Sequence, residues 1–185
     1  MNIFFLHFDP KKCAEQHCDK HVVKMLLELV QLLYTAHCTL KSENLPENHY
    51  RPFNKNHPTG VWVRMCEENY RYTINLAIEL SKEYTFRYNR IHKCDQHLSW
   101  LKNSPIFQDN PGCVYNSKKK ITFGCSKIGK TPIPLAMPDD CHRKNAIQSY
   151  RQYYNRYKTH FAKWTNRPEP YWFTPNRFLN FDKAL

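Results

Sequence analysis

Apolar residues near the start of the chain recur at the spacing of one buried helical face. They follow one another at intervals of mostly three or four residues, and comprise Cys18, Val22, Met25, Leu26, Leu29, Leu33 and Ala36. Asp9 and Pro10 are typical of a helix start, because an Asp side chain accepts free backbone N–H groups and Pro has no N–H to leave unpaired. The pattern predicts one long helix from these residues to about Thr39. The short apolar run at residues 3–5 before it is interpreted as a strand or an extended N-terminal arm.

A second long helix is predicted after a polar loop. Pro46, Pro52 and Pro58 punctuate this loop, and each is incompatible with a helix interior. Over residues 59–88 the apolar side is regular again, formed by Trp62, Met65, Tyr72, Leu76, Leu80 and Tyr84. Asn69 interrupts this side. It is interpreted as a hydrogen-bonded core amide, with a group facing a cleft as the less favoured alternative.

The second half of the chain predicts shorter helices and irregular loops. Helices are expected at about residues 95–102 and 143–159, the second with tyrosines at helical spacing. Residues 112–138 hold three of the four glycines and three consecutive lysines, which predicts an irregular basic loop that can include a short hairpin. The aromatic, proline-rich tail from Trp164 onwards predicts no regular structure. We therefore expect a mainly α protein: a single compact domain over residues 1–185 with two long helices, a shorter C-terminal helix and irregular basic loops.

The charge balance predicts a polyanionic partner. The chain carries 28 Lys and Arg residues against 16 Asp and Glu, a formal net charge of +12. Such an excess on one small domain is typical of proteins that bind nucleic acid or an anionic membrane. Aromatic residues make up 15% of the chain, which suits stacking on bases, although a tight aromatic core under solvated lysines is the alternative. The predicted partner is duplex DNA, bound without sequence preference because phosphate contacts carry no base information.

Neither an export signal nor a membrane span is predicted. The apolar start of the chain is short, and no stretch approaches the roughly 18 apolar residues of a membrane helix. The eight cysteines form no CxxC pair, so free thiols in a reducing compartment are favoured over disulfides. These features predict an intracellular protein without a membrane partner.

The densest cluster of reactive side chains is the run HCDKH that begins at His17. On a continuous helix, one stripe beside the apolar face would carry His17, His21, Lys24 and Glu28. Asp19 would project from the opposite flank. Two histidines four residues apart suit a metal, but tetrahedral zinc requires two further ligands, and no HExxH or paired-cysteine motif supplies them. We therefore expect no metal and no cofactor, and interpret the histidines as core or phosphate-contacting groups.

Other predicted nucleic-acid contacts are basic groups near helix starts and in loops. His57 directly precedes the second predicted helix, where free N–H groups suit a phosphate, with an ordinary capped turn as an equal alternative. Arg143 and Lys144 open the last predicted helix with positive charge where the helix dipole disfavours it, which suggests an external anion. The remaining predicted contacts are Lys20, Lys118, Lys119 and Lys120. No P-loop, dinucleotide fingerprint or GxSxG motif is present.

Several stretches of the chain resemble a known family. They are FDPKKCAEQHCDKHVVKMLLELVQLL, NHPTGVWVRMCEENYRY, PLAMPDDCHRKNAIQSYRQYY and the segment at residues 164–172. Together they resemble an uncharacterised family of tailed phages and large DNA viruses, and this resemblance covers most of the chain. It implies a viral protein that acts in the cytoplasm or nucleus of its host.

The order of parts is also distantly similar to the pyrimidine-dimer DNA glycosylases, the endonuclease V-type repair enzymes. That family combines a short N-terminal arm, a long helix, a loop ending in histidine, a second long helix and an aromatic tail. Its members flip a nucleotide, attack the sugar C1′ with the N-terminal amine to form a Schiff base, use a carboxylate on the first helix, and cut the strand by β-elimination. An α-amine suits this role because its pKa is ordinarily about 8.

The resemblance implies roles for individual residues. The second residue is a large Asn, before which methionine is normally retained, so the amine would be that of Met1. Asp19 and Glu28 are the candidate carboxylates, His21 is an alternative occupant of that position, and His57 matches the phosphate-contacting histidine of the family. We therefore expect a DNA glycosylase and AP lyase acting on a flipped damaged or modified base. The alternatives are a non-catalytic viral protein that binds nucleic acid or a nucleotide, for instance against a host defence, and a structural protein of a virus particle.

Overall fold

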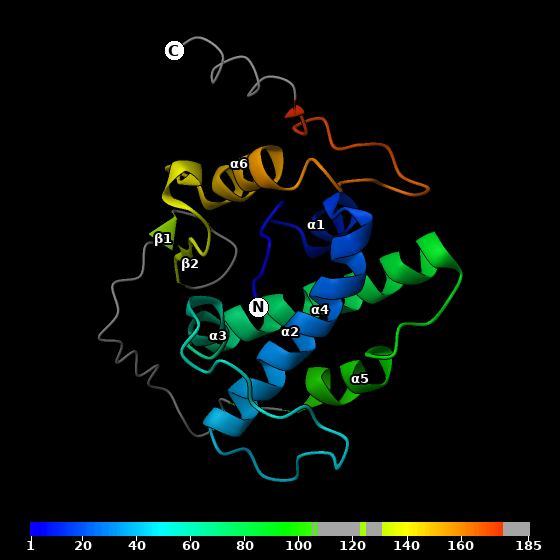
Figure 1. Cartoon of the computed structure of the whole chain (residues 1–185). Coiled ribbons are helices and arrows are strands. Elements are labelled where there is room, and N and C mark those ends of the chain that lie inside the picture. Colours follow the sequence, from blue (N-terminus) through cyan, green and yellow to red (C-terminus); the bar gives the residue numbers. More distant parts are fainter. Residues whose placement is uncertain (105, 107–122, 125–130, 176–185) are drawn as a thin grey trace.

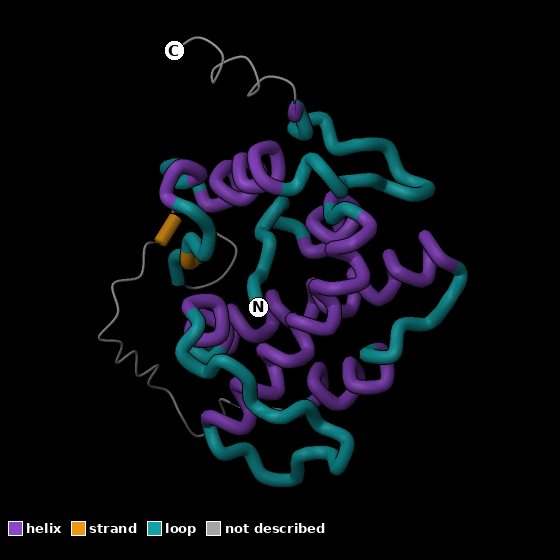
Figure 2. The backbone as a smooth tube through the Cα atoms, viewed as in Figure 1, coloured by secondary structure: helices purple, strands orange, loops and turns teal. Residues whose placement is uncertain are grey.

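Helices form most of the described chain, which confirms the prediction of a mainly α fold. The structure, a computed structural model, describes residues 1–104, 106, 123–124 and 131–175. Its helices are α1 (Pro10–Gln16), α2 (Asp19–Thr39), α3 (Pro58–Val63), α4 (Glu67–Tyr88), α5 (Asp95–Asn103) and α6 (Ala146–Tyr157), with a 3-10 turn η1 (Asp139–Cys141). Two short strands, β1 (Phe123–Gly124) and β2 (Ile133–Pro134), pair antiparallel. Figure 2 shows how little strand accompanies the helices.

The first predicted helix is broken into α1 and α2, so the prediction of one continuous helix is wrong. The start is as predicted, since the Asp9 carboxylate accepts a hydrogen bond from the Lys12 N–H at 2.9 Å. His17 and Cys18 adopt extended backbone angles, with ψ of 136° and 162°. The Asp19 N–H then donates to the Lys163 carbonyl at 2.8 Å. A contact with the distant tail thus takes the place of a helical hydrogen bond at the break.

The second predicted helix is also broken, into α3 and α4. Cys66, directly before α4, is fully extended with a φ of −160°. The Asn69 side chain bridges the break, because its Nδ2 group donates to the Trp62 carbonyl at 2.8 Å and to the Thr131 hydroxyl at 2.7 Å. Asn69 is completely buried. Its interpretation as a core amide is therefore confirmed for the Nδ2 group, whereas its Oδ1 atom is buried without a hydrogen-bond partner among the described residues.

The last helix begins later than predicted. Asn145 caps α6, its side-chain oxygen accepting from the Ile147 N–H at 2.8 Å. Arg143 and Lys144 consequently lie directly before the helix, next to the positive end of its dipole, rather than within its first turn. The predicted helix at residues 95–102 is confirmed by α5. Residues 164–174 form no helix or strand, as predicted.

The apolar N-terminal arm is part of the core. Residues 3–6 are at most 4% exposed, and the arm runs between α6 and the group of helices α2, α3 and α4 (Figure 1). The Phe4 ring packs against Tyr154 of α6, while the Phe5 ring packs against Trp62 of α3 and Tyr72 of α4. Burial of a phenylalanine contributes about 1.5–3 kcal/mol. The arm is therefore fixed by packing on both of its sides. The predicted apolar stripe of the first helix is buried as well.

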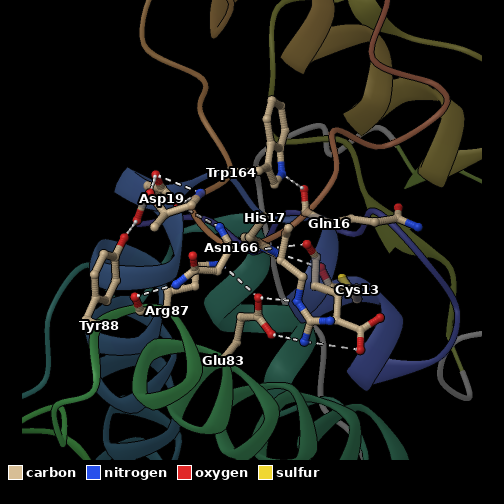
Figure 3. A network of polar contacts seen from close by, with 12 residues as sticks. Cys13, Gln16, His17, Asp19, Glu83, Arg87, Tyr88, Trp164 and Asn166 are labelled. Atoms are coloured by element: carbon tan, nitrogen blue, oxygen red, sulfur yellow. Dashed lines mark hydrogen bonds and ion pairs between the residues drawn. The ribbon is translucent and has the colours of Figure 1, made fainter.

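A buried ion-pair network joins the tail to α2 and α4 (Figure 3). The Arg87 side chain is fully buried and donates to the Glu83 carboxylate at 2.7 Å, the Asp19 carboxylate at 2.9 Å and the Glu15 carbonyl at 3.0 Å. Glu83 also accepts from Arg167 of the tail at 2.9 Å. Burial alone would raise the pKa of Glu83, but the hydrogen bonds from Arg167 and Arg87 outweigh it and lower that pKa. The carboxylate is therefore charged and paired in the folded protein.

Candidate functional site

The amino terminus lies beside the carboxylate of Glu28 on α2. The Met1 amine nitrogen is 3.9 Å from Glu28 Oε2, and the Asn2 backbone N–H donates to the same oxygen at 2.7 Å. The Glu28 side chain is 11% exposed. A buried carboxylate that faces a terminal amine is unusual, because chain ends are normally exposed and poorly ordered. These two groups form the centre of the candidate site.

The Asn2 side chain fixes the position of the terminus. Its Nδ2 group donates to the Ala136 carbonyl at 2.8 Å, and its Oδ1 atom accepts from the Ile3 N–H at 2.8 Å and from the Tyr150 hydroxyl at 3.3 Å. The first peptide is thereby tied to α6 and to the segment that follows β2. Sequence reasoning used Asn2 only to argue that Met1 is retained, and no local pattern signals this second role.

The main chain of Met1 accounts for its exposed surface. Its side chain is only 2% exposed, yet the residue as a whole is half-buried. The surface that reaches solvent therefore belongs mostly to the backbone, which begins with the amine. The backbone of Met1 is therefore held beside Glu28 and also reaches solvent.

Two further polar groups flank the pair of Met1 and Glu28. Lys24, one helical turn before Glu28, places its Nζ atom 3.6 Å from Glu28 Oε1 and is 70% exposed. His57 caps α3, with its Nδ1 atom accepting from the Thr59 N–H at 3.3 Å. The pKa of His57 is lowered to about 4, first by burial and then by the N-terminal ammonium. His57 is therefore neutral at pH 7, and would contact a phosphate as a hydrogen-bond donor rather than as a cation. Its own geometry is that of an ordinary capped turn.

Asp19 lies away from this site. It is nine residues before Glu28, which places it on the opposite side of α2 and about 13 Å away along the helix axis. Its carboxylate accepts from Arg87 at 2.9 Å and from the Thr165 hydroxyl at 2.8 Å (Figure 3). The interpretation of Asp19 as a catalytic carboxylate next to the amine is therefore replaced by a structural role in holding the tail.

His21 shares the Glu28 side of α2 but is covered by the arm. It is 6% exposed, its ring lies 4.4 Å from the Phe4 ring, and its Nδ1 atom is hydrogen-bonded to the Tyr154 hydroxyl. The pKa of His21 is lowered to about 2, first by burial and then by the nearby His17 and lysine side chains. His21 is therefore buried against Phe4 and Tyr154, and its predicted catalytic role gives way to a core role.

Buried neutral histidines predict a marked loss of stability on mild acidification. Burial lowers the pKa of His17 to about 4, against 6.5 for an ordinary histidine, and His21 behaves likewise. Their stabilisation is complete above about pH 6.5 and is lost as the pH falls toward 4, because only the unfolded chain binds the protons. We expect the free energy of unfolding, measured with urea, to fall by a few kcal/mol between pH 7.5 and pH 5.

A matched variant tests the origin of this pH dependence. His17→Asn should reduce the difference in unfolding free energy between the two pH values, whereas replacement of the exposed His160 by Asn should leave it unchanged. An unfolding free energy that stays constant from pH 7.5 to pH 5 would contradict the prediction.

The predicted basic contacts are spread over several parts of the surface. Lys20 is exposed, lies over the Phe161 ring at 5.2 Å, and lines a surface pocket of about 470 Å³ with Tyr84 and Tyr88. Arg143 donates to the Asp140 and His142 carbonyls, and Lys144 is exposed. The other three predicted contacts, Lys118, Lys119 and Lys120, lie outside the described residues. Among the described predicted contacts, His57 is the one near the amine. Lys24, which lies next to Glu28, was not among the predicted contacts.

Within the described part of the chain, no three His, Cys, Asp or Glu side chains come together as metal ligands would. His17, one of the two histidines that suggested a metal in the sequence, is completely buried, and its Nδ1 atom is hydrogen-bonded to the Cys13 carbonyl at 2.7 Å. No helix among the described residues has the length and apolar character needed to cross a membrane.

Comparisons of the chain with protein-family models, with curated proteins and with solved structures found no match.

Proposed function

We propose that this protein is a DNA glycosylase and AP lyase in which the Met1 amine is the nucleophile and the Glu28 carboxylate takes up the proton of the Met1 ammonium. The observation that carries the proposal is the pairing of the N-terminal amine, on a residue whose backbone reaches solvent, with a buried carboxylate 3.9 Å away. Nucleophilic amines need a neighbouring group that removes their proton. The net charge of +12 supports a polyanionic substrate.

The proposed reaction needs only these groups and a flipped nucleotide. Glu28 takes a proton from the Met1 ammonium, and the neutral amine attacks C1′ of the sugar. In a damaged nucleotide the base leaves C1′ with its bonding electrons and takes up a proton, and the sugar ring then opens as the bond from C1′ to the ring oxygen breaks and that oxygen takes up a proton. At an abasic site the sugar is already open, and the aldehyde oxygen leaves as water. Both routes give an imine between Met1 and C1′. Loss of a proton from C2′ then breaks the bond from C3′ to the phosphate oxygen, and water releases the sugar from the amine.

The positions of the flanking groups support this reaction. Lys24 is close to Glu28 and mostly exposed, so it can meet a phosphate next to the flipped nucleotide. Neutral His57 can donate a hydrogen bond to a second phosphate of the same DNA. The Asn2 contacts hold the amine in place without occupying it, which lowers the entropic cost of reaching the reactive geometry.

The direct test is reduction of the imine by borohydride. Incubation with an abasic-site duplex and borohydride is expected to give a covalent adduct of protein and DNA, and without borohydride the strand should be cut. An uncleaved N-terminal tag should abolish both results while duplex binding persists, because an extended chain has no amine beside Glu28. The same tag at the C-terminus is the control.

Two outcomes would overturn the proposal. If the N-terminally tagged protein is trapped as efficiently as the free one, another amine reacts. If neither is trapped, the pairing of Met1 with Glu28 is an anchor for the arm, and a non-catalytic protein that binds nucleic acid or a nucleotide becomes the better interpretation.

A further inference from the structure

We propose that Phe53 is the side chain that enters the base stack of duplex DNA when a nucleotide is turned toward Met1. This inference rests on the proposed function and adds how the substrate is opened. Phe53 belongs to the loop before α3, and its side chain is 58% exposed. An exposed phenylalanine in a loop gains nothing from burial in the free protein, but apolar side chains are the wedges with which proteins unstack base steps.

The loop backbone presents Phe53 in a fixed position. The Phe53 N–H donates to the buried Thr35 hydroxyl of α2 at 3.1 Å. The next residue, Asn54, has a left-handed φ of 48°, and its carbonyl accepts from the His57 N–H at 2.8 Å. The hydrogen bond of the Phe53 N–H and the tight turn that follows therefore fix the backbone on both sides of this exposed side chain.

The loop lies on the same side of α2 as the candidate site. Thr35 is seven residues after Glu28, which places the two on one face about 10 Å apart. The chain then returns toward the amine. Gly60 packs against Leu32, and His57 is close enough to the N-terminus for the ammonium charge to help lower the pKa of His57. A nucleotide that leaves the stack opens a gap beside its own sugar, so a wedge must lie near the group that reacts with this sugar.

The charges around Phe53 suit the strand that it would enter. Residues 51–64 contain Arg51, Lys55 and Arg64 and no Asp or Glu. Arg51 and Lys55, two residues before and two residues after Phe53 in the sequence, are both exposed. The Arg64 side chain packs close to Gly60, as the Asn54 carbonyl does, each 3.9 Å from the position that a Cβ atom on Gly60 would occupy. The Arg64 Nη1 atom is buried there without a hydrogen-bond partner. An aromatic ring between cations is the arrangement that binds a stacked nucleic-acid strand.

The test compares duplex and single-stranded substrates. Phe53→Ala is expected to slow borohydride trapping on an abasic-site duplex by about tenfold or more, since unstacking a base step costs a few kcal/mol. On a single-stranded abasic oligonucleotide the rate should stay within about twofold of that of the unmodified protein. Phe53→Leu should retain part of the duplex activity. The matched control is Phe8→Ala, which removes another phenylalanine that is 48% exposed, outside this loop.

A second measurement separates the wedge from the chemistry. In a duplex with a tetrahydrofuran abasic analogue next to 2-aminopurine, binding of the unmodified protein should raise the 2-aminopurine emission, and Phe53→Ala should bind without this rise. An equal rise for both proteins, or an equal loss of trapping on duplex and single strand, would overturn the wedge. If trapping fails for every protein but the Phe53-dependent rise remains, only the proposed reaction is wrong.

Discussion

Replacement of Glu28 by Gln is expected to slow imine trapping on an abasic-site oligonucleotide by about a hundredfold or more, the usual scale for a general acid–base group. The amide has nearly the same shape and its oxygen can still accept from the Asn2 N–H. It cannot take up the proton of the Met1 ammonium. The fold should lose only about 1 kcal/mol, the worth of a typical hydrogen bond. Single-turnover trapping and urea unfolding of the same preparation measure the two effects.

Control variants separate proton transfer from positioning. Glu79→Gln, which removes a carboxylate paired with Lys82 on α4, should trap at the unchanged rate. Asn2→Ala loosens the terminus but keeps the carboxylate, so we expect a smaller reduction than for Glu28→Gln. If Glu28→Gln traps as fast as the unmodified protein, Glu28 only anchors the arm, and the assignment of its role is wrong.

Replacement of Arg87 by Ala is expected to cost about 3–5 kcal/mol of unfolding free energy. The guanidinium is fully buried and serves Glu83, Asp19 and the Glu15 carbonyl together. Its removal leaves the Glu83 carboxylate, which is 4% exposed, with Arg167 as its remaining ion-pair partner among the described residues. A buried charge that loses a partner destabilises the fold more than the pair itself stabilised it. Urea unfolding at pH 7.5 measures the loss.

The matched control is Arg71→Ala on the same helix. Arg71 pairs with Glu67 four residues earlier, but both side chains are more than half exposed, at 69% and 52%. Such pairs are worth at most about 1 kcal/mol. Arg87→Ala should also speed proteolysis in residues 163–167, because Asp19 and Glu83 hold this segment. A variant within 1 kcal/mol of the unmodified protein would show that the network contributes far less than its burial implies.

The sequence alone was sufficient where one short stretch carries the whole signal. Helical spacing of apolar residues predicted the buried face of α2, and Asp9 followed by Pro10 predicted the start of α1, because both depend on backbone geometry within a few residues. The same spacing placed His21 and Glu28 on one side of a helix. The short apolar run at residues 3–5 indicated the N-terminal arm, because apolar side chains are buried wherever the rest of the chain provides a core.

The tertiary structure decided the breaks between helices and the membership of the candidate site. His17 and Cys18 continue a helical pattern, but they are extended because the Asp19 N–H meets the Lys163 carbonyl from the far end of the chain. Asn2 contacts Glu28 at a separation of 26 residues and Ala136 at 134 residues. Asp19 looked as suitable as Glu28 in the sequence, and it meets Arg87 instead, 68 residues away. Local propensity fixes which face of a helix a carboxylate occupies, while the packing of distant segments decides which charge it faces there.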